Sequence, residues 1–152
     1  APPRRRRIPV RVFNFAAGPA TMPLEAVHLP GRLGPAALAA LYHRADAYVA
    51  PTRLESFGIA ALEARVAGLP VAGLADSGLG EFVTDGVHGV LARDDADLAV
   101  RLAGLLADPA ALAAMAERNR TTEPDQVWER VVPQVRRLYR SAPPTGPELG
   151  GR

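Results

Sequence analysis

The sequence contains no cysteine, no lysine and no long hydrophobic run. The absence of cysteine excludes a disulfide framework, a thiolate metal site and a cysteine nucleophile. No apolar stretch approaches the roughly 18 residues that a membrane-spanning helix needs. The first residues carry no apolar segment of the kind found in secretory signals, so the cytoplasm is the expected location.

The remaining composition is that of one globular domain. The chain has 152 residues, of which 48% are hydrophobic and 22% charged, so a single packed core is expected. The three histidines, His28, His43 and His88, are isolated and lack the short spacing of metal ligands. We therefore expect no metal site built on histidine.

Positive charge is concentrated near the start of the chain. All 18 basic residues are arginine, and four of them are consecutive, Arg4–Arg7. Without that run, 14 arginines stand against 16 acidic residues, so the body is mildly acidic and no broad nucleic-acid surface is expected. Residues 1–8 are expected to be a solvated basic tail. The alternative is that the run contacts nucleic acid or the anionic inner face of a membrane.

Short apolar segments alternate with segments of helical character. Strands are predicted at Val10–Phe15, Ala26–Leu29, Ala47–Ala50, Val71–Leu74 and Gly89–Ala92. Helices are predicted at Pro35–Arg44, Gly58–Ala67, Ala96–Ala107, Ala110–Arg118 and Asp125–Arg140, the last one kinked or split at Pro133. This order predicts an α/β domain over residues 9–140, with a Rossmann-like parallel sheet, helices on both faces and a helical C-terminus. Residues 141–152 are expected to form a loose tail, and a ligand is expected beyond the carboxyl ends of the strands.

The segment PTRLESFGIAALEARVAGLPV, residues 51–71, carries the clearest chemical pattern. Glu55 lies in a loop after a predicted strand, Gly58 begins the next helix, and Glu63 lies in the second turn of that helix. Free amides at a helix N-terminus suit a diphosphate, and carboxylates suit the hydroxyl groups of sugars. A nucleotide sugar offers both kinds of group. The alternative is that Glu55 caps the helix and Glu63 is only a solvated residue.

The same segment resembles the signature of the retaining glycosyltransferases of family 4, which have the GT-B fold. The resemblance continues upstream in LYHRADAYVAPT, downstream in DSGLGEFVTDGVHGVLA, and in the closing VWERVVPQVRRLY, so it covers roughly residues 26–139. It implies transfer of a hexose from a UDP- or GDP-sugar to an acceptor hydroxyl with retained configuration. It also implies that no metal and no other cofactor is obligatory. The acceptor, whether saccharide, lipid or small molecule, is not indicated.

The resemblance also implies roles for individual residues. Glu55 would contact the hydroxyls of the donor hexose, which makes it the candidate catalytic residue, and Glu63 would bind the ribose hydroxyls. The other donor-binding candidates are Ser56, the backbone amides of Phe57, Gly58 and Ile59, the loop residues Gly31, Arg32 and Leu33 near the base, and Gly78 and Gly80 in the pocket wall. The alternative for Gly78 and Gly80 is a plain turn before a helix N-terminus.

The sequence departs from the family at its N-terminal side. The N-terminal GT-B domain with the acceptor site has no counterpart, and neither has the first strand of the donor domain with its diphosphate-binding lysine. Because cations usually contribute much to stabilising the leaving diphosphate, this chain alone is expected to bind a donor without catalysing transfer. The missing central strand leaves two alternatives: its flanking strands pair directly, or Val10–Phe15 takes its place.

Other interpretations stay open. The chain could be a non-catalytic nucleotide-sugar-binding domain, a truncated remnant, or another GT-B enzyme such as an epimerase or a phosphorylase. Asp95-Ala96-Asp97 spells the Asp-x-Asp motif of metal-dependent transferases, but it lies far along the chain from the donor segment. A capped helix start with first-turn charge is the simpler interpretation of this tripeptide. The sequence indicates neither the base, the hexose nor the oligomeric state.

Overall fold

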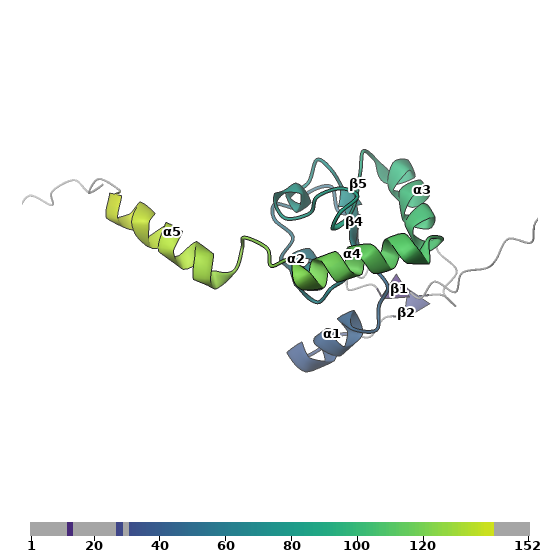
Figure 1. Ribbon diagram of the computed structural model, residues 1–152, viewed down its shortest axis with the longest axis horizontal. Helices are drawn as coiled ribbons and strands as arrows, with labels where there is room; N and C mark the ends of the chain where they lie inside the picture. The colour runs from purple at the N-terminus through teal and green to yellow at the C-terminus, as the bar shows by residue number, and fades with distance from the viewer. Residues whose placement is uncertain (1–11, 14–26, 29–30, 142–152) are drawn as a thin grey trace, which may run out of the picture.

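The computed structural model describes residues 12–13, 27–28 and 31–141. The elements run in the order β1 Val12–Phe13, β2 Val27–His28, α1 Pro35–Tyr42, β3 Tyr48–Ala50, α2 Ile59–Val66, β4 Val71–Leu74, the 3-10 helix η2 Gly78–Glu81, β5 Gly89–Ala92, α3 Asp95–Leu106, α4 Pro109–Thr121 and α5 Trp128–Ser141 (Figure 1). The alternation predicted from the sequence is confirmed, with helix ends moved by up to three residues. The predicted basic tail and residues 9–11, 14–26, 29–30 and 142–152 lie outside the described residues.

The main sheet consists of three parallel strands in the order β3-β4-β5. The central strand β4 is buried on both faces. Val71 packs with Ala61 of α2 and with Leu79 of η2, whereas Ala72 and Leu74 pack on the other face with α3 and α4. Burial on both faces explains why this strand is continuously apolar in the sequence. The predicted Rossmann-like sheet with helices on both faces is confirmed.

The first two strands form a sheet of their own. β1 pairs with β2 in parallel, and within the described part of the chain no ladder joins β1 to β3. Among the described residues neither alternative for the missing central strand is observed, because residues 12–13 pair with β2 and not with β3. Pairing requires two strands about 4.8 Å apart, and no described segment occupies the outer edge of β3.

Side-chain caps and one buried amide fix the two helices on the outer face. Asp94 caps α3 by accepting from the amide of Asp97 at 2.8 Å, and Asp108 caps α4 by accepting from the next helical amides. The tripeptide at residues 95–97 is thus the first turn of a capped helix, as the simpler interpretation predicted. Near the end of α4, the buried Asn119 donates to the carbonyl oxygens of Leu69 at 2.8 Å and His88 at 2.9 Å. These bonds tie α4 to the amino ends of β4 and β5.

The last helix, α5, extends away from the body of the domain (Figure 1). It continues through Pro133 as one helix, so the predicted split is not observed. Its apolar side chains are mostly exposed, with Trp128 at 77% and Tyr139 at 81%. Arg130 forms an ion pair with Asp125 and a second one with Glu123 at 3.4 Å. These pairs join the first turn of α5 to the segment that connects α4 with α5.

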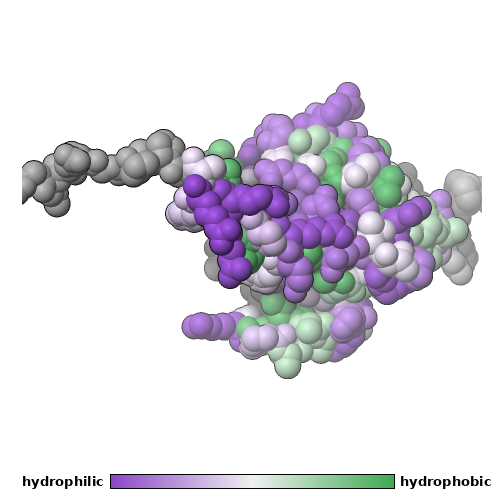
Figure 2. Space-filling model, turned by 60° about the vertical axis from the view of Figure 1, so that its left-hand side comes forward, coloured by the Kyte–Doolittle hydropathy of each residue, from purple (hydrophilic) through white to green (hydrophobic). Residues whose placement is uncertain are grey.

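The surface is mainly hydrophilic on the face that Figure 2 shows, and paler apolar areas lie over its lower part, where α1 is found. Leu38 and Leu41 of α1 are half-buried and Tyr42 is buried, which confirms the predicted apolar face of this helix.

Among the helices the structure describes, none is by itself long and apolar enough to cross a membrane. Helices α3 and α4 have the length and composition of a membrane span only when they are taken together, and a bend of 96° separates them.

An ion pair joins α3 to the turn before β5. Nη2 of Arg101 lies 2.8 Å from each carboxylate oxygen of Asp85, and the Leu91 amide donates to the same carboxylate at 2.9 Å. Burial raises the pKa of Asp85, but the hydrogen bonds from Arg101 and Leu91 outweigh burial and hold the pKa below its ordinary value. This carboxyl therefore releases its proton more readily in the folded than in the unfolded chain.

Acid should weaken the fold partly through Asp85. A depressed carboxyl pKa stabilises the fold above the unfolded value of about 3.9, and the stabilisation is lost as the pH falls through the folded value. We expect the melting temperature of the unaltered protein to fall more steeply than that of Asp85→Asn between about pH 5 and pH 2, measured by thermal denaturation. Asp46→Asn, at an exposed position, serves as the control and should follow the unaltered protein. Parallel curves for Asp85→Asn and the unaltered protein would contradict this prediction.

Candidate functional site

Two loops meet at the carboxyl ends of β3 and β4. The first, residues 51–58, leads from β3 to α2, and the second, residues 75–77, leads from β4 to η2. The amide of Gly78 donates to the carbonyl oxygen of Glu55 at 2.9 Å. A Cβ atom at position 78 would lie 2.2 Å from the carbonyl oxygen of Ser56, so only glycine permits this approach. The structure therefore brings the predicted Glu55 segment and Gly78 into direct contact.

A single leucine holds this junction from the protein interior. Leu79 is completely buried. A Cβ atom on Gly73 would lie 2.2 Å from its Cδ1, and a Cβ atom on Gly58 would lie 3.0 Å from its Cδ2. Gly58 also has φ of +86°, in the left-handed region, which turns the chain from the loop into α2. Leu79 thus packs closely against β4 and against the start of α2.

The amino end of α2 has no side-chain cap. Gly58 is the N-cap residue, its carbonyl oxygen accepts from the Leu62 amide at 2.9 Å, and no side chain in the described part of the chain caps the first-turn amides. The alternative that Glu55 caps this helix is therefore wrong. Uncapped amides at the positive end of the helix dipole can donate to an oxyanion.

Glu55 lies in the loop before this helix end, and Glu63 lies in the second turn of α2. Neither carboxylate makes a hydrogen bond or an ion pair with any residue of the described part of the chain, and Glu55 is half-buried while Glu63 is exposed. Burial raises the pKa of Tyr48, and the negative charges of Glu55 and Glu63 raise it further. Both charges therefore act on the same half-buried phenol of β3. The two carboxylates remain available to hydroxyl donors from a ligand.

A second tyrosine responds to the same charge. Burial raises the pKa of Tyr42 to about 12, with smaller increases from Tyr48 and Glu63. The Tyr42 and Tyr48 rings lie edge to face with centroids 6.2 Å apart, and the Tyr42 hydroxyl donates to the Ala60 carbonyl at 3.4 Å. Both phenols thus stay protonated at neutral pH and link α1, β3 and α2 beneath the carboxylates.

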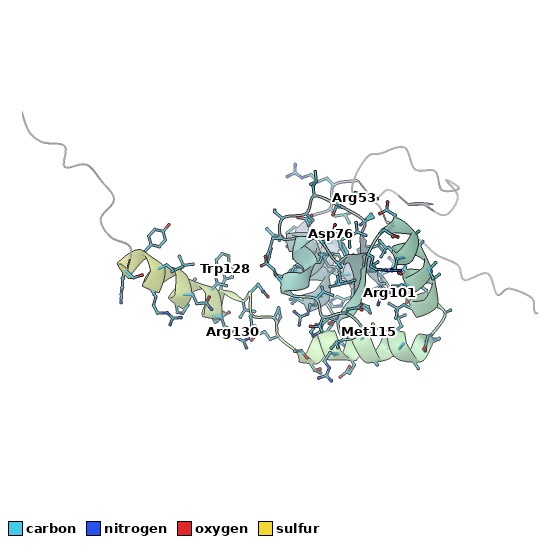
Figure 3. All side chains as sticks on the ribbon, turned by 90° about the horizontal axis from the view of Figure 1, so that it is seen from above. Arg53, Asp76, Arg101, Met115, Trp128 and Arg130 are labelled. Carbon is cyan, nitrogen blue, oxygen red and sulfur yellow. The ribbon has the colours of Figure 1, made fainter. Side chains whose placement is uncertain are left out.

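An ion pair at the same edge was not foreseen from the sequence. Nη2 of Arg53, in the loop after β3, lies 2.6 Å from a carboxylate oxygen of Asp95, at the start of α3. Asp95 lies far along the chain from the donor segment but close to it in space, since the carboxyl ends of parallel strands share one edge. Figure 3 shows Arg53 and Asp76, which follow β3 and β4, on the side of the molecule away from α4. The pair is exposed, at 68% and 61%, so it adds little to stability.

The remaining predicted site residues differ in how they relate to this junction. Gly31, Arg32 and Leu33 precede α1, and no hydrogen bond between described residues joins them to the loop 51–58. Gly80 has open space around its α-carbon, in contrast to Gly78. Ser56 and Ile59 belong to the loop and the first turn of α2, and both side chains are exposed. No three His, Asp or Glu side chains among the described residues gather as metal ligands.

Comparison with known proteins identifies the family. Residues 20–122 match the family described as Glycosyl transferases group 1. The chain belongs to this family. It is 42% identical over 123 residues to the glycogen synthase of Mycobacterium tuberculosis, a match that covers 78% of this chain and 30% of the relative. It is also 42% identical over 107 residues to the D-inositol 3-phosphate glycosyltransferase of Geodermatophilus obscurus, covering 69% of this chain and 23% of that enzyme.

Solved structures show the same fold as this group 1 glycosyltransferase chain. Sucrose-phosphate synthase from Thermosynechococcus elongatus superposes with a TM-score of 0.67 at 32% identity, covering 76% of this chain and 30% of that one. Anabaena HepE, solved in complex with UDP and glucose, gives 0.64 at 23% identity, covering 77% and 32%. The chain thus corresponds to about a third or less of the length of these proteins. The GT-B-type, Rossmann-like architecture implied by the resemblance is confirmed.

Proposed function

We propose that this group 1 glycosyltransferase chain supplies the donor-binding part of a retaining hexosyltransferase that uses a UDP- or GDP-hexose. The observation that carries the proposal is the uncapped amino end of α2, with Glu55 before it and Glu63 in its second turn, both without a side-chain partner among the described residues. The first-turn amides suit phosphate oxygens, and the carboxylates suit ribose and hexose hydroxyls. A nucleotide sugar is the class of ligand that presents both sets of groups on one molecule.

Each part of the junction has a role in this proposal. Negative charge grows on the departing diphosphate as the glycosidic bond breaks, and the amides at residues 57–59 with the α2 dipole stabilise it. Glu55 accepts hydrogen bonds from the hexose and orients its anomeric carbon, and Glu63 accepts from the ribose. Gly78 lets the second loop close against the first. The proposal gains support from Anabaena HepE, a protein of like fold that was solved with UDP and glucose.

The chain is proposed to bind the donor without transferring the hexose by itself. It contains no lysine, and at the donor edge Arg53 is engaged by Asp95. Its relatives are about three times as long. We propose that a second, N-terminal GT-B domain contributes the acceptor site and further positive charge. The exposed apolar side chains of α5 are compatible with such a partner.

Calorimetric titration with UDP, GDP and their hexose conjugates tests the proposal. One nucleotide is expected to bind, and the added affinity of its hexose conjugate should be lost in Glu55→Ala, which removes the acceptor for the hexose hydroxyls. Glu129→Ala, on the exposed side of α5, is the matched control and should bind like the unaltered protein. A folded chain that binds neither nucleotide would refute the donor site. Release of hexose from a bound nucleotide sugar above the rate of Glu55→Ala would refute the inactivity of the isolated chain.

A further inference from the structure

A pocket of about 330 Å³ lies beneath the connection between α4 and α5. Its walls come from the last turn of α2, from η2, from the segment before β5 and from residues 122–126. It therefore lies toward the amino ends of β4 and β5, whereas the donor loops follow the carboxyl ends of the strands. Its charged lining residues are Arg65, Glu81, Glu123 and Asp125, and its polar lining includes His88 and Gln126.

Arg65 is the unusual member of this wall. It is only 4% exposed, and its Nε atom is buried without a hydrogen-bond partner among the residues that the structure describes. No carboxylate of the described residues forms an ion pair with it, and the polar atom near its Nη2 is Nε2 of His88, at 3.2 Å. Burial lowers the pKa of Arg65, and the more distant charge of Asp125 partly offsets that effect. A guanidinium removed from water without a counter-ion is costly, so its position indicates a missing acceptor.

His88 presents a second donor at the same place. The amide of Thr84 donates to Nδ1 of His88 at 3.1 Å, so Nδ1 carries no proton. Burial and the charges of Arg65 and Arg118 lower the pKa of His88, which favours the neutral ring. A neutral imidazole ring whose Nδ1 is unprotonated carries its proton on Nε2. The Nε2–H of His88 and the Nη2 of Arg65 are therefore two donors 3.2 Å apart that share no acceptor.

We propose that this pocket binds a small molecule through an oxyanion, a phosphate or a carboxylate group, whose oxygens accept hydrogen bonds from Arg65 and from Nε2–H of His88. One oxyanion supplies both the counter-ion that the buried guanidinium lacks and the acceptor that the two donors require. Charge-assisted bonds of this kind form most favourably where water is excluded. The site is separate from the donor loops and adds a ligand beyond the proposed nucleotide sugar.

The acidic side chains at the rim of the pocket indicate which hydrogen-bonding groups the rest of the ligand has. Glu123 and Asp125 are both engaged by Arg130, which Figure 3 shows at the start of α5, and Glu81 is exposed to water. Exposed carboxylates are screened by solvent, whereas Arg65 acts at low dielectric, so an anion inside the pocket remains favoured. Oε1 of Gln126 is buried without a partner. Hydroxyl or amino donors on the ligand would satisfy this oxygen and the rim carboxylates.

Histidine side-chain NMR on the full 152-residue protein tests the site, with inorganic phosphate and acetate as probes. Phosphate at millimolar concentration is expected to shift the ring signals of His88 saturably, while His43, which lines a different pocket, stays unchanged. Arg65→Met should weaken phosphate binding about tenfold or more, because a charged hydrogen-bond partner is lost. Arg44→Met, at an exposed position, is the matched control and should leave the titration unchanged.

The NMR titration of the unaltered protein tests the proposed site even if Arg65→Met does not fold. Saturation by phosphate alone supports a phosphate ligand, and saturation by acetate as well supports a carboxylate. The absence of any saturable His88 shift with either probe would overturn the proposal. Failure of nucleotides to bind would leave the His88 result unaffected, so the two proposals are tested separately.

Discussion

Gly78→Ala is expected to destabilise the protein by about 1–3 kcal/mol and to weaken nucleotide binding strongly. The new Cβ atom would lie 2.2 Å from the carbonyl oxygen of Ser56 and 2.8 Å from the α-carbon of Phe57. Both are backbone atoms and cannot rotate away, so the two donor loops must separate and the Gly78–Glu55 hydrogen bond must break. Urea unfolding measures the first effect and calorimetric titration with the nucleotide that binds measures the second.

Gly80→Ala is the matched control for this prediction. It lies two residues further along η2, and a Cβ atom there would meet no heavy atom within 4 Å. Its φ is not positive, so alanine causes no backbone strain, and the change in unfolding free energy should stay within about 0.5 kcal/mol. If both variants unfold and bind alike, the close contact between the loops does not exist in solution.

The parts of the fold that the sequence predicted are those set by local pattern. The boundaries of β4 and β5 were predicted to the residue, because each is a short apolar run with Gly or Pro beside it. The end of α4 was placed three residues early, since its last turn is held by Asn119, whose partners Leu69 and His88 are distant in sequence. The separation of β1 and β2 from the main sheet also depends on pairing between distant segments, which no local pattern indicates.

In the candidate site too, the sequence predicted the residues that lie close together along the chain and missed contacts between distant segments. Glu55, Gly58 and Glu63 fall within one loop and the helix that follows it, so their spacing alone placed them together. The Arg53–Asp95 ion pair spans 42 residues and the Arg65–His88 contact spans 23, so neither had a local signal in the sequence. Arg53 and Asp95 were predictable in principle, because both follow parallel strands and thus share an edge. The Arg65–His88 pair had no such rule, since burial of an arginine depends on the complete packing around it.

Glu63→Ala is expected to weaken binding of the nucleotide about ten- to hundredfold, because hydrogen bonds from ribose hydroxyls to a carboxylate contribute about 1.5–3 kcal/mol. The melting temperature should not change, since Glu63 is exposed and makes no hydrogen bond or ion pair with the described residues. Glu129→Ala again provides the control for removal of one negative charge. Calorimetric titration and thermal denaturation of the three proteins provide the comparison.

The 2′-deoxy form of the same nucleotide shows whether Glu63 acts on the ribose or only through its charge. If the carboxylate accepts from the 2′-hydroxyl, the unaltered protein should bind the deoxynucleotide more weakly than the ribonucleotide, and Glu63→Ala should bind both alike. Loss of the hydroxyl and loss of the carboxylate would then be non-additive, as expected of two groups in contact. If Glu63→Ala keeps the full preference for the ribonucleotide, the ribose lies elsewhere. In that case the repulsion between Glu63 and the phosphates would make the variant bind more tightly, the opposite of the predicted sign.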